Sequence, residues 1–197
     1  MRFRPVQLVL LAVVVGACSA PQNRTEQAAV AGPATTAAAQ ASTVRKSQAR
    51  PAPPGILPAA RRRLAPSLRV TAFDGRVVTL DDFRGRPLMV SFFESWCPVC
   101  EVEQPDLSRV AADFSPRVGF VGVSYHDTVA AGRAYQRRFN VPYPLANDSS
   151  GRTWAAWRVP YQPVTVLVDK KGRVAVRYDG GTTGGTLRAA LAYLVGE

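Results

Sequence analysis

Hydrophobic positions from residue 67 onward follow a strand period in some stretches and a helix period in others. Residues 68–87 alternate apolar and polar positions around Asp74-Gly75, which predicts a β-hairpin. Residues 87–94, "PLMVSFFE", are a continuous apolar run between turn signals and predict a buried strand, as do residues 118–125. A helical period begins at Pro98, and we expect one broad apolar face made by Val99, Val102, Leu107, Val110 and Phe114.

The rest of the chain continues this exchange of helices and strands. Amphipathic helices are expected at 128–139 and 186–195, a short helix at 151–159, and strands at 143–148, 164–169 and 174–180. Strands alternate with helices through the centre, and a hairpin precedes the last helix. This order predicts an α/β fold with a central mixed sheet flanked by helices, in one domain spanning residues 67–197.

The first seventeen residues have the pattern of an export signal. Arg2 and Arg4 precede an apolar stretch at residues 6–15, which is too short to span a bilayer. Val15-Gly16-Ala17-Cys18 resembles the bacterial lipobox, whose cysteine is acylated and becomes the mature N-terminus. We therefore expect a signal peptide at 1–17, lipidation of Cys18 and a location on the outer side of the cell membrane. The alternative is an ordinary cleaved signal that ends near a cysteine.

Residues 18–66 are rich in Ala, Pro, Thr and Gln and lack a periodic apolar pattern, which predicts a disordered linker. The net charge of +11 is uneven: residues 1–66 hold nine Lys or Arg and one acid, whereas residues 67–197 are nearly balanced. A nucleic-acid partner is not expected, because it would need a basic face on the domain itself. A basic linker beside an anionic membrane is the simpler interpretation, and solvated linker charge is the alternative.

Two of the three cysteines, Cys97 and Cys100, form a Cys-x-x-Cys motif. A structural zinc site would need four ligands, and His126 is the chain's single histidine. A structural disulfide closing so short a loop would contribute little to stability. A redox pair fits best, because Cys97 lies where a strand ends and a helix begins, and the free N–H groups of the first helical turn stabilise a thiolate.

In this interpretation Cys97 is the exposed nucleophile, and Cys100, one turn further along, is the buried resolving thiol. Pro98 suits the first turn of the helix, where no N–H is required.

The segment "VSFFESWCPVCEVEQPDL" resembles the active-site block of the thioredoxin superfamily, and most closely its exported TlpA/ResA/DsbE branch of thiol–disulfide oxidoreductases. The matching positions are Trp96, Cys97, Cys100, Glu103 and Pro105. Residues 159–174, "VPYQPVTVLVDKKGRV", resemble the segment that carries the branch's cis-proline, at Pro163. The resemblance covers residues 67–197 and implies a thioredoxin-like fold with an N-terminal hairpin and an extra strand–helix insertion at 143–159.

The resemblance also implies roles for individual residues. Cys97, Cys100 and Glu103 would be catalytic, with Glu103 exchanging a proton with Cys100 if burial raises its pKa; a surface ion pair is the alternative. The expected substrate-binding residues are Trp96, Pro98, Gln162 and Pro163.

Two positions depart from the branch's pattern. Ser91 stands where thioredoxins place a buried aspartate, so Glu103 would matter more. Glu94 stands where a small residue is common, and we expect it to face solvent.

These features together predict a membrane-anchored oxidoreductase that needs no cofactor or metal. It would reduce disulfides of exported cysteine-containing proteins, including apocytochrome c, and take electrons from a membrane redox partner. The alternatives are a DsbE-like oxidase, as in actinobacteria whose Ala/Arg-rich style this chain shares, and a Sco-like copper protein using Cys97, Cys100 and His126. A peroxiredoxin would need threonine where Glu94 stands, and a binding module would not need the cysteine pair.

Overall fold

The structure is a computed structural model that describes residues 50–197. The expected signal peptide at 1–17, the lipidation site Cys18 and most of the expected linker therefore lie outside the described residues. In the described part of the chain, no helix has the length and apolar character needed to cross a membrane.

A seven-stranded mixed sheet runs through the domain in the order β2-β1-β5-β4-β3-β6-β7. The three central strands β5, β4 and β3 are parallel, and the strands on either side of them pair antiparallel. The strands are β1 (Arg69–Ala72), β2 (Val77–Thr79), β3 (Leu88–Phe92), β4 (Gly119–Ser124), β5 (Leu145–Asn147), β6 (Val164–Val168) and β7 (Val174–Asp179). Every residue of β3, β4 and β6 is buried, as their continuous apolar sequences predict.

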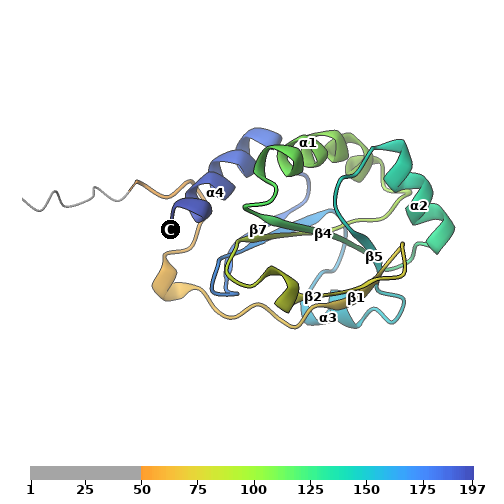
Figure 1. Cartoon of the computed structure of the whole chain (residues 1–197), viewed down its shortest axis with the longest axis horizontal. Helices are drawn as coiled ribbons and strands as arrows, with labels where there is room; N and C mark the ends of the chain where they lie inside the picture. The colour runs from red at the N-terminus through yellow and green to blue at the C-terminus, as the bar shows by residue number, and fades with distance from the viewer. Residues whose placement is uncertain (1–49) are drawn as a thin grey trace, which may run out of the picture. The chain divides into compact units, whose positions relative to one another are not determined.

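Helices cover both faces of the sheet (Figure 1). The helices α1 (Pro98–Phe114), α2 (Val129–Arg138) and α4 (Gly184–Gly196) lie on one face, and the short α3 (Arg152–Ala156) lies on the other. The described residues also form two 3₁₀ turns, η1 (Ala59–Arg61) and η2 (Leu80–Phe83). Each face has its own hydrophobic core, the first built around Leu107, Leu187 and Leu191 and the second around Phe92, Trp154 and Trp157.

The predicted α/β fold is confirmed, including the hairpin at β1–β2, the inserted β5–α3 unit and the hairpin β6–β7 before the last helix. The apolar face expected for α1 is wrong at two positions. Leu107, Val110 and Phe114 are buried, but Val99 is 52% exposed and Val102 is 83% exposed. The buried face of α1 begins with Cys100, Glu103 and Gln104, and Val99 and Val102 lie on the other side of the helix.

The structure differs from the expected linker over residues 50–66. Ile56 is buried, the Leu57 amide donates to the Ala175 carbonyl, and Leu64 forms a β-bridge with Arg173. Arg62 is buried and pairs with Asp169 and Glu197. A few isolated anchors hold this segment against β7 and α4, and isolated anchors leave no periodic pattern for sequence analysis to detect.

Strand directions define two ends of the domain. The reactive end is where β3 and β4 finish and β6 begins, since Phe92 pairs with Val164. The distal end is where β3 begins and where the β6–β7 turn lies, since Leu88 pairs with Val168. Cys97 follows β3 and therefore lies at the reactive end.

Candidate active site

Cys97 and Cys100 form a disulfide at the start of α1, with their Cα atoms 5.2 Å apart. Cys97 is the N-cap of the helix, and its Sγ accepts a hydrogen bond from the Cys100 amide at 3.2 Å. The same amide can stabilise a thiolate on Cys97 once the disulfide is reduced. The strand–helix junction predicted from sequence is therefore confirmed as the place where the pair lies.

The expectation of an exposed Cys97 is wrong in this oxidised form. Cys97 is 5% exposed and Cys100 is 3% exposed. Cys97 turns inward because its sulfur both caps the helix and bonds to Cys100, so a partner must approach closely to reach it.

Apolar side chains stand out from the surface beside the buried pair. Trp96 is 61% exposed and directly precedes Cys97, while Val99 and Val102 project from the first turns of α1. Tyr161, 52% exposed, belongs to the loop before Pro163. Exposed hydrophobic side chains gathered next to a reactive group are typical of a surface that contacts a partner.

The Gln162–Pro163 peptide bond is cis, as the resemblance implied. Pro163 is buried and directly precedes β6, whose first residue, Val164, pairs with Phe92 on the strand that leads to Cys97. Gln162 is half-buried. The register brings the cis-proline loop to the reactive end of the sheet.

Glu103 is buried at 6% exposure on α1, three residues beyond Cys100. Its Oε1 accepts the Thr182 amide at 3.0 Å. Burial raises the pKa of this carboxyl to about 7, with a smaller contribution from Asp106, although the Thr182 hydrogen bond opposes the rise. The alternative of a surface ion pair is wrong, because within residues 50–197 no cation pairs with Glu103.

A buried polar network supports the same turn of α1. The Tyr135 hydroxyl donates to the Cys100 carbonyl at 3.0 Å, and Gln104 donates to the Tyr143 hydroxyl at 2.9 Å. Burial raises the pKa of both tyrosines far above the ordinary value, so both hydroxyls keep their protons. Sequence analysis missed these residues, because a tyrosine within an amphipathic pattern is expected to be an ordinary residue of the hydrophobic core.

Ser91 is buried on β3, directly opposite Thr165 on β6. Thr165 Oγ1 is buried and has no hydrogen-bond partner among the residues that the structure describes. The place where thioredoxins carry an aspartate therefore holds hydroxyl groups here, and Glu103 is the carboxyl that lies one helical turn from Cys100.

The expectation that Glu94 faces solvent is wrong. Its side chain is fully buried, and Oε1 accepts the amides of Tyr125 and His126 at 3.0 Å each. The His126 ring contacts the same oxygen through Nδ1 at 3.3 Å. Two amide donors explain the burial, because they replace the water that a carboxylate would otherwise bind.

A second carboxylate, Asp127, binds the same loop and was missed at the sequence level. Its oxygens accept the Ser95 amide at 2.9 Å and the Ser95 hydroxyl at 2.6 Å. Together with Glu94, Asp127 ties the segment before Cys97 to the loop after β4. The arrangement fixes the position of the cysteine pair.

His126 lies against Glu94 and does not join the cysteines as a ligand. Its side chain is 61% exposed. Within residues 50–197, no three His, Cys, Asp or Glu side chains are grouped as a metal site.

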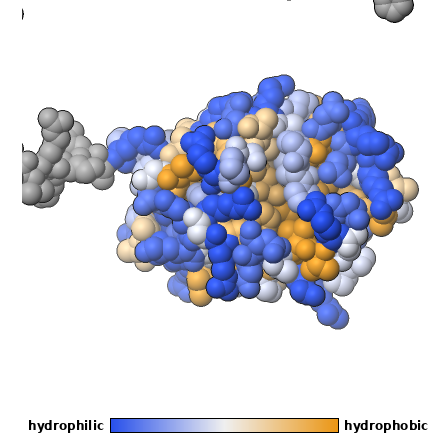
Figure 2. All heavy atoms as spheres, viewed as in Figure 1, coloured by the Kyte–Doolittle hydropathy of each residue, from blue (hydrophilic) through white to orange (hydrophobic). Residues whose placement is uncertain are grey.

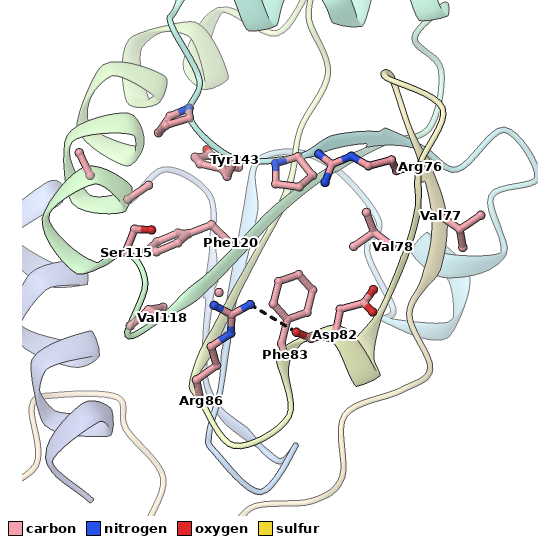
Figure 3. A pocket seen from close by; sticks show the side chains of 15 residues that line it. Arg76, Val77, Val78, Asp82, Phe83, Arg86, Ser115, Val118, Phe120 and Tyr143 are labelled. Carbon is pink, nitrogen blue, oxygen red and sulfur yellow. Dashed lines mark hydrogen bonds between the residues drawn. The ribbon is translucent and has the colours of Figure 1, made fainter.

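A separate hollow of about 440 Å³ lies away from the cysteines, at the distal end (Figure 3). Phe83, Val118 and Phe120 line it, and Arg86 reaches across Phe83 to the Asp82 carbonyl. No catalytic or substrate-binding residue expected from sequence lines this hollow.

Comparisons with known proteins agree with this geometry. Residues 62–177 match the AhpC/TSA family. The soluble secreted antigen MPT53 of Mycobacterium tuberculosis is 36% identical over 108 residues, which is 55% of this chain and 59% of MPT53. The chain therefore spans less than two thirds of that relative.

Two further matches cover more of their partners. A DsbE homolog of Paracoccus denitrificans, named a thiol:disulfide interchange protein, is 33% identical over 131 residues, 64% of this chain and 71% of the homolog. The crystal structure of a secreted Mycobacterium tuberculosis disulfide oxidoreductase homologous to E. coli DsbE aligns with a TM-score of 0.60 and 28% identity, over 64% of this chain and 96% of that one.

Proposed function

The chain belongs to the AhpC/TSA family, and we propose that it is a thiol–disulfide oxidoreductase whose reactive group is the Cys97–Cys100 pair. The observation that carries this proposal is the disulfide at the start of α1, with the Cys100 amide donating to Cys97 Sγ. The names of the DsbE homolog and of the aligned secreted enzyme support the same chemistry.

In the reducing direction, the Cys97 thiolate attacks one sulfur of a substrate disulfide. A mixed disulfide forms, and the other substrate sulfur leaves as a thiolate. The Cys100 thiol gives its proton to Glu103 and attacks Cys97 Sγ, which releases the second substrate thiolate and closes the Cys97–Cys100 bond. The substrate gains two electrons and the pair loses two; the oxidising direction is the same sequence reversed.

Glu103 suits the proton transfer in this scheme. A carboxyl with a pKa of about 7 can accept a proton and return it near neutral pH. It lies on the same face of α1 as Cys100, one turn away.

We assign substrate contact to the exposed apolar side chains beside the pair and to the cis-proline loop. Trp96 and Tyr161 offer exposed aromatic surfaces, and Pro98 is exposed directly after Cys97. Gln162 can pair its main chain with an extended segment of the partner. Cysteine-containing exported proteins, apocytochrome c among them, are the expected substrates. A membrane redox partner would restore the reduced pair.

Attachment to the outer side of the cell membrane through an acylated Cys18 is part of the proposal. Support comes from the lipobox-like sequence at residues 15–18 and from the aligned enzyme's description as secreted.

The test of the activity is reduction of insulin disulfides by the protein with an added electron donor. The wild-type chain should accelerate the reaction, and Cys97→Ser should abolish the acceleration. An equal rate for both proteins would contradict the assignment.

The direction of electron flow has its own test, the reduction potential of the pair in defined thiol buffers. A potential near or below about −250 mV, toward thioredoxin, supports the proposed reductase. A potential toward about −120 mV, the value for DsbA, would support the oxidase alternative.

Two other chemistries fit the site less well. A Sco-like copper site would need His126, whose ring is held at Glu94. A peroxidase would need a hydroxyl where Glu94 stands, and Glu94 is occupied by main-chain amides. We expect no consumption of peroxide by the pure protein.

A further inference from the structure

The distal end of the domain carries a groove of about 490 Å³ that the proposed chemistry does not use. It lies between the segment after η1, the η2 turn and the β6–β7 turn. Its lining includes the exposed Leu64, Arg84 and Lys171 and the half-buried Arg86 and Lys170. Arg86 and Phe83 also line the hollow of Figure 3, so the two depressions adjoin across η2.

The acids of this groove are already neutralised by arginines. Asp169 is buried and pairs with Arg62 at 3.2 Å and with Arg173 at 2.8 Å. Asp81 pairs with Arg84 at 2.8 Å.

Three cations of the groove keep uncompensated charge. In the described part of the chain, no carboxylate lies within ion-pair distance of Arg86, Lys170 or Lys171. Arg86 donates to the carbonyls of Asp82 and Pro116, and Lys170 donates to that of Val195, so these contacts position the cations without removing charge. The groove therefore presents a positive surface to solvent.

An exposed hydrophobic side chain lies within this basic surface. Leu64 is 77% exposed, between Arg63 and the Lys171 turn. In Figure 2 hydrophilic side chains dominate the visible face, and hydrophobic ones are exposed near its centre. An anionic lipid surface attracts clustered Lys and Arg side chains, and a leucine exposed among them can enter the headgroup region.

The N-terminal part of the chain approaches the domain at this same end. The Ala65 amide donates to Gly172, and Leu64 bridges to Arg173, so residues 64–65 run beside the β6–β7 turn. Cys18, through which we propose attachment to the membrane, lies in the sequence that precedes this segment.

We propose that the distal groove binds the anionic headgroups of the membrane to which the chain is attached, with Lys170, Lys171 and Arg86 contacting phosphate and Leu64 entering the interface. This inference rests on the proposed membrane attachment. The disulfide lies at the other end of β3, so it faces away from the bilayer and toward soluble exported proteins.

The test is co-sedimentation of residues 19–197 with vesicles of phosphatidylcholine that contain about a third phosphatidylglycerol. This fragment lacks the signal and Cys18 but keeps the compact unit Ser47–Glu197 and both cores. The variant is Lys170→Glu/Lys171→Glu, at two of the proposed phosphate contacts. The matched control, Arg69→Glu/Arg152→Glu, makes the same change of charge at exposed positions outside the groove.

We expect the wild type and the control to bind these vesicles, and the groove variant to bind at least about tenfold more weakly. Binding should fall when phosphatidylglycerol is left out. Equal weakening of both variants, or no binding by the wild type, would overturn the proposal. A groove variant that binds vesicles as well as the wild type, but no longer binds an acidic protein, would also overturn the proposal.

Disulfide exchange with a soluble substrate separates this proposal from the proposed function. All three proteins should reduce insulin at the same rate if the groove only orients the domain. Loss of vesicle binding with unchanged insulin reduction supports the groove and leaves the active site intact. Absence of insulin reduction by the wild type would instead count against the proposed function.

Discussion

At the scale of single residues, the candidate site depends on two buried carboxylates with opposite surroundings. Glu94 accepts two amide hydrogen bonds and contacts a histidine, whereas Glu103 accepts one amide hydrogen bond and its burial raises its pKa. Sequence analysis identified Glu103 from a resemblance but misplaced Glu94, because the sequence does not reveal that amides of a loop 31 residues away turn toward it.

The raised pKa of Glu103 makes the stability of the protein depend on pH. A carboxyl whose folded pKa is about 7, above its ordinary value of 4.5, stabilises the fold fully below pH 4.5 and loses that contribution as pH rises through 7. Glu103→Gln removes the charge, so the variant should exceed wild type by about 2–3 kcal/mol at pH 8.5 and match it near pH 4.5. Urea unfolding at both pH values measures this.

The same variant should alter the pH profile of catalysis. The rate of disulfide exchange by the wild type should rise between about pH 6 and 8, as Glu103 loses its proton and can accept one from Cys100. The rate for Glu103→Gln should be lower and should depend less on pH across that range. Insulin reduction measured from pH 5.5 to 8.5 checks this, and an unchanged profile would contradict a role for Glu103 in proton transfer.

At the scale of elements, the loop between β3 and α1 is held by the loop after β4. Glu94 and Asp127 cross between them. The strands and helices themselves were predictable, because their apolar periods are long and regular. The contacts between loops were not, because they join residues far apart in sequence without any periodic pattern.

Removal of the Glu94 carboxylate should loosen this junction. Glu94→Ala leaves the amides of Tyr125 and His126 without their acceptor and should cost about 2–4 kcal/mol of unfolding free energy. Glu101→Ala is the control, since it breaks only the pair with the exposed Arg138 and should cost under about 1 kcal/mol. Equal losses in guanidinium unfolding would contradict the role of Glu94.

At the scale of the whole molecule, the described fold begins before residue 67. Ile56 and Arg62 anchor residues 50–66, which sequence analysis assigned to a linker because residues 18–66 are rich in Ala, Pro, Thr and Gln and lack a periodic apolar pattern. A buried arginine between two acids cannot be recognised until the fold brings Asp169 and Glu197 together.

This segment should contribute to stability. Arg62→Ala leaves the buried Asp169 with one cationic partner fewer and should lower the free energy of unfolding by about 3 kcal/mol. A fragment that begins at residue 67 should lose at least as much. Arg61→Ala, an exposed neighbour, should have almost no effect. Thermal unfolding of the two variants and of the shorter fragment, each compared with residues 50–197, tests this prediction. A fragment from residue 67 that is as stable as residues 50–197 would contradict it.

The most direct test of the cysteine chemistry is trapping of the mixed disulfide. In residues 19–197, Cys97 and Cys100 are the remaining cysteines. Reduced Cys100→Ser, mixed with oxidised insulin, should retain an insulin chain on Cys97 that mass spectrometry detects, because the resolving thiol is gone. Cys97→Ser should retain almost none. Trapping on Cys100 instead, or none on either variant, would contradict the assignment of Cys97 as the nucleophile.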